Sequence, residues 1–266
     1  MGLFGMTVVL LFIGIALAAP LLAPYSPSEQ FNGAELRPPS STHLFGTDQL
    51  GRDLLSRIIF GTRASLTVGV LAVSMGATVG VLTGLLAGYL GGWIDALIMR
   101  TYDALLAFPG VLLAIAIVAV TGPGILNVAV AIAIAQMPAD ARLTRAIVLS
   151  QRERDYVLAA RSLGASRGRI MARHVLPNTV PPLLVQLSLA MGVAVLAEAA
   201  LSYLGLGTQP PTPSWGGMLS DSRPFLRQAA WYGIWPGVVL ALLLIALNCL
   251  ADALRHAFDP RRINVR

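Results

Sequence analysis

The stretch "RDYVLAARSLGASRGRIMARHVLPN", residues 154–178, carries five arginines in a chain that is otherwise mostly apolar. Residues 156–163 favour a helix, and Gly164 is placed to end it in the left-handed conformation that helix C-termini use. Ser166 can cap a second helical piece over 167–175. The stretch therefore predicts a short cationic helix–turn–helix hairpin between two apolar helices.

The composition around this hairpin is that of a membrane protein. The 266 residues are 56% hydrophobic and 12% charged, with a mean hydropathy of +0.72. A soluble domain carries about 25% charged residues. All nineteen basic residues are Arg, against thirteen acids. Because these arginines lie beside apolar segments, they favour a bilayer surface rather than nucleic acid as the partner.

Missing residue types exclude several chemistries. Without Lys the chain has neither a P-loop nor a Schiff-base lysine. The single Cys249 excludes an internal disulfide and a multi-cysteine metal site. His43, His174 and His256 lack ligand spacing and are interpreted as structural or surface residues. We therefore expect no catalytic residue, no metal site and no bound cofactor on this chain.

Long apolar segments predict the spans. A bilayer core needs about 20 apolar residues per helix. The first segment ends in "ALAAP", which resembles a signal-peptide cleavage site, but it lacks a positive leading region, so we expect a retained helix. Six candidate spans follow: 3–24, 65–90, 100–121, 125–149, 179–204 and 231–254.

Glycines line one face of the second candidate span. Gly76, Gly80, Gly84 and Gly88 recur every four residues. Such small residues let helix backbones approach closely in lipid. The stripe predicts either tight packing within this chain or an interface with another subunit.

The distribution of arginines predicts the orientation. Eight lie between residues 142 and 173, and four more lie in 255–266. Since cytoplasmic loops are enriched in Lys and Arg, the hairpin and both termini are expected in the cytoplasm. The segments 25–63 and 205–230 then face outward.

The two outward segments have shapes of their own. "FGTDQLGRDLLSRIIFGTR", 45–63, predicts a turn and a short interfacial helix capped by Asp53. "GTQPPTPSWGGMLSDSRPFL", 207–226, has four prolines and predicts a loop of fixed shape.

Polar residues inside the spans are rare, and they mark candidates for a polar pathway through the membrane. Glu198 must face protein or water, because a central acid costs about 2.5–3.5 kcal/mol in lipid. It either lines the pathway or pairs with another helix. Asn127, Gln136 and Gln186 are weaker candidates, with interhelical hydrogen bonds as the alternative. Exposed ion pairs are expected at the turn between the second and third spans, from Asp95, Arg100 and Asp103.

The hairpin resembles the EAA loop of ABC importer permeases, written EAA-x3-G-x9-I-x-LP. Five positions match at the required spacing: Ala159, Ala160, Gly164, Leu176 and Pro177. Leu158 stands where the family has Glu, and His174 where it has Ile. The nearest acid, Asp155, lies one turn earlier.

Four long stretches resemble the dipeptide/oligopeptide/nickel branch of these permeases, and they span residues 45 to 261. They are "FGTDQLGRDLLSRIIFGTRASL", "DYVLAARSLGASRGRIMARHVLPN", "AEAALSYLGLGTQPPTPSWGGML" and "FDPR". The resemblance implies an all-α polytopic membrane protein of about six transmembrane helices, with the type I ABC importer fold. We expect a first helix and outer segment over 1–63, a five-helix transmembrane domain over 64–256 with its hairpin at about 150–178, and a cytoplasmic tail over 257–266.

The same resemblance implies a non-enzymatic permease subunit in a bacterial or archaeal plasma (inner) membrane. It would form half of a pathway for di- or oligopeptides, or for a small solute such as a nickel chelate. Its implied partners are a sister permease, two ABC ATPase subunits that hold ATP and Mg, and an extracytoplasmic solute-binding protein. The implied ATPase-coupling residues are Asp155, Ala159, Ala160, Arg161, Leu163, Gly164, Ala165, Ser166, Leu176 and Pro177.

Three other functional classes of membrane protein are alternatives to a permease subunit. A secondary transporter would need inverted repeats, broken helices and an ion site. A membrane enzyme would need paired carboxylates, a Ser-His set or a metal cluster. A purely structural subunit would need no shaped cytoplasmic hairpin. No residue selects the substrate.

Overall fold

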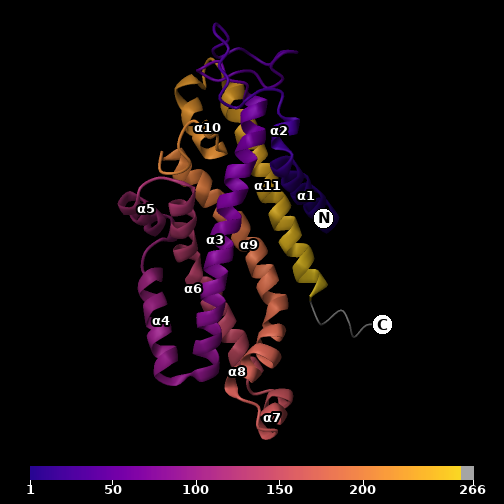
Figure 1. Cartoon of the computed structure of the whole chain (residues 1–266), viewed down its shortest axis with the longest axis vertical. Coiled ribbons are helices and arrows are strands. Elements are labelled where there is room, and N and C mark those ends of the chain that lie inside the picture. The colour runs from indigo at the N-terminus through magenta and orange to yellow at the C-terminus, as the bar shows by residue number, and fades with distance from the viewer. Residues whose placement is uncertain (259–266) are drawn as a thin grey trace.

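The computed structural model describes residues 1–258 as a bundle of helices (Figure 1). Over these residues, β pairing is limited to an isolated bridge between Thr47 and Asp53. The expected tail lies outside the described residues from position 259 on. The helices are α1 (Gly2–Leu17), α2 (Ala19–Leu22), α3 (Leu54–Leu90), α4 (Gly92–Leu106), α5 (Gly110–Thr121), α6 (Ile125–Gln151), α7 (Asp155–Ser162), α8 (Arg167–Ile170), α9 (Leu176–Tyr203), α10 (Trp215–Ser222) and α11 (Ala230–Ala257).

Four helical stretches are long and apolar enough to cross a membrane, by length and composition: α3, α6, the run from Arg167 to Tyr203, and α11. They confirm four of the six candidate spans. The run from Arg167 to Tyr203 contains α8, a π-helical turn and α9, so the second half of the predicted hairpin leads directly into a span.

The third candidate span is wrong as a single straight helix. α4 and α5 are bent by 88° at the break between them. Pro109 lies in this break with φ −55° and precedes α5 as its N-cap. A proline donates no backbone hydrogen bond, and it disfavours a helical conformation at the residue before it. This broken pair counts as at most one span.

The first candidate span is shorter than predicted. α1 has 16 residues and ends at Leu17, and α2 follows with Pro20 in its first turn. α1 packs against α11, where a Cβ on Gly5 would lie 2.7 Å from the Ala246 carbonyl oxygen. The rings of Phe12 and Trp215 pack edge to face, with their centroids 5.8 Å apart. The helix is thus part of the packed bundle.

α3 is the longest helix, with 37 residues, or about 55 Å at the usual rise per residue. The Asp53 side chain caps it by accepting a hydrogen bond from the Ser56 amide, as predicted. The separate interfacial helix over residues 54–63 is wrong, because this segment forms the first turns of α3. No proline interrupts the stretch, so the helix runs on to Leu90.

The glycine stripe packs against α6 of the same chain. A Cβ on Gly80 would lie 2.8 Å from the Met137 carbonyl oxygen, and one on Gly88 would lie 2.9 Å from that of Arg145. Gly76 and Gly84 approach α6 in the same way. Of the two alternatives, the glycine stripe therefore serves tight packing within the chain. The contact between α3 and α6 is the most extensive contact between two helices of the described residues.

Ion pairs fasten α4 to α6. The Arg145 guanidinium donates two hydrogen bonds of 2.5 Å to Asp95, and Arg142 lies 2.5 Å from Asp103. The predicted acids thus pair with arginines of α6. Arg100, which was expected to join them, is exposed and forms none of the ion pairs among the described residues.

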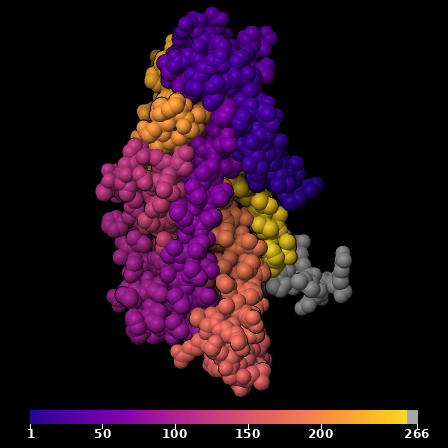
Figure 2. Space-filling model, viewed as in Figure 1, coloured from indigo at the N-terminus to yellow at the C-terminus, as the bar shows by residue number. Residues whose placement is uncertain are grey.

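The two ends of the bundle differ in structure. The hairpin with α7 lies at one end, and the segment before α3 lies with α10 at the other (Figure 1). Figure 2 shows the hairpin projecting beyond the neighbouring helices.

We predict that Gly84→Ala destabilises the protein, because the added Cβ would overlap the Ala141 carbonyl oxygen. Overpacking of this kind costs about 1–3 kcal/mol. Thermal unfolding in detergent measures the effect as a lower Tm. Gly14→Ala in α1 is the control, since nothing lies within 4 Å of its Cβ position. Equal melting temperatures for the two variants would contradict the packing.

Candidate functional site

The turn of the hairpin is a Schellman motif. The Ala165 amide donates to the Ala160 carbonyl at 3.1 Å, and the Gly164 amide donates to the Arg161 carbonyl at 3.0 Å. Gly164 has φ +79°, the left-handed conformation that this motif requires after the helix end. The predicted helix-ending role of Gly164 is confirmed.

The second arm of the hairpin joins a spanning helix. Ser166 caps α8 by accepting a hydrogen bond from the Arg169 amide at 3.4 Å. A π-helical turn, Met171–Val175, then connects α8 to α9. The Leu176 amide donates to the Met171 carbonyl, five residues earlier, and Pro177 has no N–H to donate to the Arg173 carbonyl. The second arm of the hairpin is therefore continuous with α9.

The inner face of the hairpin is anchored on the bundle. Val157, Ile170 and Val175 are buried in one apolar cluster with Tyr89 of α3 and Val148 of α6. Arg152 adds a hydrogen bond of 3.2 Å to the Gly88 carbonyl. These contacts give the hairpin a fixed base, so its outer surface has a defined shape.

The outer face presents apolar side chains. Leu163 is 88% exposed, and Leu158 and Tyr156 are also exposed. Of the predicted coupling residues, Ala160, Ala165 and Leu176 pack against the inner cluster. The others lie on the exposed side of the hairpin: Asp155, Ala159, Arg161, Leu163, Gly164, Ser166 and Pro177.

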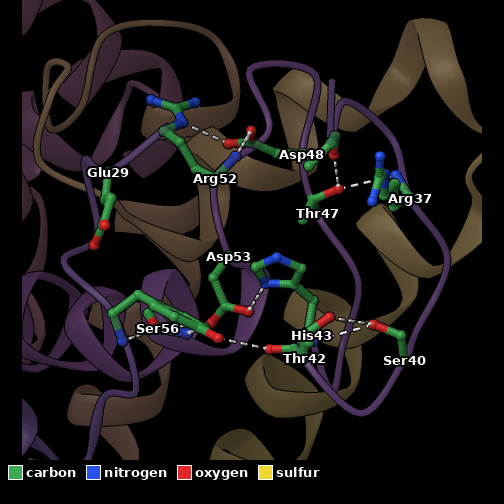
Figure 3. A network of polar contacts seen from close by, with 12 residues as sticks. Glu29, Arg37, Ser40, Thr42, His43, Thr47, Asp48, Arg52, Asp53 and Ser56 are labelled. Carbon is green, nitrogen blue, oxygen red and sulfur yellow. Dashed lines mark hydrogen bonds and ion pairs between the residues drawn. The ribbon is translucent and has the colours of Figure 1, made fainter. Parts of the chain in front are cut away.

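A buried polar network organises the opposite end of the bundle (Figure 3). One Asp53 carboxylate oxygen accepts hydrogen bonds of 2.8 Å from the amide and the hydroxyl of Ser56. The other lies 2.9 Å from Nδ1 of His43. His43 therefore has the structural role expected of it, and it holds the irregular segment against the start of α3.

Asp48 forms the second half of this network. One of its oxygens accepts hydrogen bonds of 2.9 Å from the Leu50 and Arg52 amides. The other accepts a hydrogen bond of 2.6 Å from Nε of Arg52 and lies 3.3 Å from Nε of Arg57. All three charged side chains are more than nine-tenths buried. Only Asp53 was predicted to form a contact here, although the repeated Asp and Arg of "TDQLGRDLLSR" are a visible signal.

Comparison with known proteins decides the family. The sequence model of the protein family described as "Binding-protein-dependent transport system inner membrane component" matches residues 80–264 of this chain. A second model, "N-terminal TM domain of oligopeptide transport permease C", matches residues 1–39. The chain belongs to this permease family.

Relatives of known name cover nearly the whole permease. It is 46% identical to a dipeptide transport system permease protein of Alkalihalophilus pseudofirmus, over 98% of this chain and 86% of that one. It is 48% identical to a di/tripeptide transport system permease protein of Pseudomonas aeruginosa, over 98% and 88%. A glutathione transport system permease protein of Escherichia coli is 46% identical, over 95% and 84%.

The fold of the permease matches that of a solved transporter. A chain of the methionine ABC transporter MetNI, in an inward-facing conformation, superposes with a TM-score of 0.65 at 16% identity. The match covers 77% of this permease and 98% of that chain. The expected type I ABC importer fold is confirmed, and this is a multi-pass inner membrane protein.

Glu198 links two helices of the permease. It is fully buried in α9, and its oxygens accept hydrogen bonds from Ser65 of α3 at 2.8 Å and from Ser202 at 2.7 Å. Both oxygens are thus satisfied within the chain. This geometry favours the helix-pairing alternative, and the pathway role stays a prediction.

The other predicted pathway residues also serve helix contacts. The Asn127 amide donates to the Thr121 carbonyl at 2.9 Å and so caps the end of α5. The Gln136 amide donates to the Ala190 carbonyl of α9 at 3.4 Å. Gln186, on α9, is half-buried.

Asp140 of α6 is a buried acid that was not predicted from the sequence. It is 2% exposed, and its Oδ1 has no hydrogen-bond partner among residues 1–258. It faces α3 at the glycine stripe, where a Cβ on Gly80 would lie 2.9 Å from its own Cβ. An acid inside a predicted span was the available signal.

We predict that Ser65→Ala and Glu198→Leu are energetically coupled. Each removes one partner of a buried hydrogen bond and leaves the other unsatisfied, which costs about 1–3 kcal/mol. The double variant should therefore lose less stability than the two single variants together. Denaturant unfolding in detergent measures this difference. Strict additivity would contradict the helix-pairing role.

Proposed function

We propose that this chain is the permease subunit of an ATP-driven importer of short peptides, with the hairpin of residues 154–178 as its ATPase-coupling element. The chain lacks Lys and thus a P-loop, so the energy for transport must come from another protein. The relatives transport dipeptides, di/tripeptides and glutathione, by their names. This shared chemistry supports a peptide rather than a nickel chelate as substrate.

The observation that carries the coupling role is the exposed tip of an otherwise anchored hairpin. Leu163 is 88% exposed, and the hairpin that carries it projects beyond the neighbouring helices (Figure 2). An apolar side chain in this position suits a groove on a second protein. Since the hairpin continues into α9, an ATPase that grips the tip can move a spanning helix.

The proposed assembly follows from this role. Two ATPase subunits with ATP and Mg lie in the cytoplasm at the hairpin end, and a sister permease completes the pathway. A solute-binding protein delivers the peptide at the opposite end, beside α10. Both termini of this chain lie in the cytoplasm. The spans adopt two packings, one that opens the pathway to the cytoplasm and one that opens it to the outside. Closure of the two ATPase subunits favours one of these packings over the other.

We predict that Leu163→Ser abolishes association with the ATPase subunits and leaves the permease folded. The side chain makes too few contacts within the chain to contribute to its stability. Co-purification from mild detergent, with ATPase activity assayed, measures the loss. Leu21→Ser is the matched control, since Leu21 of α2 is 89% exposed at the other end of the bundle. Retention of the ATPase by Leu163→Ser would exclude the hairpin tip as the contact.

Gly164 provides a second test, which depends on its backbone conformation rather than on the room available for a side chain. Nothing lies within 4 Å of its Cβ position, but φ is +79°. Asn tolerates this conformation and β-branched residues do not. Gly164→Asn should therefore retain peptide-stimulated ATPase activity, whereas Gly164→Val should lose at least tenfold, which corresponds to about 1.4 kcal/mol. Equal activity in both variants would show that the Schellman turn is dispensable for coupling.

A further inference from the structure

A polar pocket of about 200 Å³ opens at the end of the bundle opposite the hairpin. Its walls come from the start of α3, from the loop after α9 and from α10. Three of its lining residues bear charge: Arg52, Arg57 and Asp221. Neither the fold nor the helix contacts described above require such a pocket.

Arg52 supplies the pocket with free donors. Its side chain is only 8% exposed, and Nε is held by Asp48 at 2.6 Å (Figure 3). Its two terminal nitrogens form no hydrogen bond with any of residues 1–258. A buried guanidinium whose position is fixed but whose outer donors are unused is preorganised to bind a carboxylate.

Two further groups in the pocket lack partners. Thr208 Oγ1 is inaccessible to solvent and makes no hydrogen bond within the described part of the chain. Nε of Arg57 is also buried without a hydrogen bond, although it lies 3.3 Å from the Asp48 carboxylate. Buried polar groups without partners cost stability, so a ligand that reached the Thr208 hydroxyl would supply a missing partner.

Asp221 supplies the opposite charge. This α10 residue is exposed, and its carboxylate takes part in none of the ion pairs found among residues 1–258. The pocket thus combines guanidinium and hydroxyl donors with a free carboxylate. It is complementary to a small zwitterion rather than to a simple anion, which Asp221 would repel.

We propose that this pocket binds the charged termini of a short peptide. The peptide carboxylate would bind the Arg52 guanidinium and the Thr208 hydroxyl, and its ammonium group would bind Asp221. Every unmodified peptide has these two termini, whatever its side chains. The volume is below the 300–1,000 Å³ of a typical drug-sized site, which suits a dipeptide. The proposal rests on the proposed function and adds a receiving site on the permease itself.

The test measures binding of labelled Ala-Ala to the membrane complex of permeases and ATPases in lipid nanodiscs, without the solute-binding protein. N-acetyl-Ala-Ala, which has no ammonium group, should bind more weakly than Ala-Ala. Asp221→Asn should weaken Ala-Ala about threefold, as an exposed ion pair would, and leave N-acetyl-Ala-Ala unchanged. Thr208→Val should weaken both ligands, because both have the carboxylate.

Arg52→Gln should weaken both ligands about tenfold, the effect of losing a charged hydrogen bond. Because Arg52 also holds Asp48, the Asp221 and Thr208 variants keep the test valid if that variant misfolds. Glu29→Gln is the matched control, an exposed acid of the same end that does not line the pocket. Equal binding of the two peptides, or no effect of Asp221→Asn, would overturn the proposal.

Two further measurements separate this proposal from its alternatives. If Ala-Ala does not bind, and Asp221→Asn or Arg52→Gln instead weakens association of the solute-binding protein, the pocket is a protein-docking contact and the proposal is wrong. Import of Ala-Ala by the complete wild-type system tests the proposed function separately. Normal import with no pocket binding rejects the pocket alone, whereas absence of any peptide import rejects the proposed function.

Discussion

The close packing of α3 on α6 is the contact on which the other parts depend. Four glycines of α3 bring the two backbones together, and in lipid such packing replaces the hydrophobic effect as the force between helices. α4 is fastened to α6 by two ion pairs, and α9 is joined to α3 through Glu198 and Ser65. The hairpin rests on one end of the same helix pair through Tyr89 and Val148.

The two ends of this framework are held together by different kinds of contact. The hairpin is anchored by apolar contacts and leaves the apolar side chain of Leu163 exposed at its turn. The opposite end has no regular structure between α2 and α3, and there Asp48 and Asp53 supply the hydrogen bonds that a helix would otherwise provide (Figure 3). Burial of these charged carboxylates is energetically unfavourable unless they are hydrogen-bonded, which explains why each carboxylate has several partners.

Turns and helix caps that depend on neighbouring residues were predicted correctly, whereas the points at which helices bend or begin were predicted less well. The Gly164 turn and the Asp53 cap depend on adjacent residues, so the sequence was sufficient to predict them. The 88° bend at Pro109 was missed because apolar composition continues through it. The helix over 54–63 was wrongly separated from α3, because an apolar face beside arginines is typical of a helix that lies on the interface. Those at 52 and 57 are instead buried against Asp48.

By itself, the sequence determined the membrane class, most of the spans, the hairpin and the permease family. These depend on composition and on short-range spacing, which chain order preserves. Only the tertiary structure decided that the glycines serve α6 of the same chain, that Glu198 is satisfied by Ser65, and that Arg52, Thr208 and Asp221 share one pocket. These partners lie far apart along the chain, and nothing in their local spacing indicates which of the possible helix faces will meet. That choice is made by the packing of whole helices.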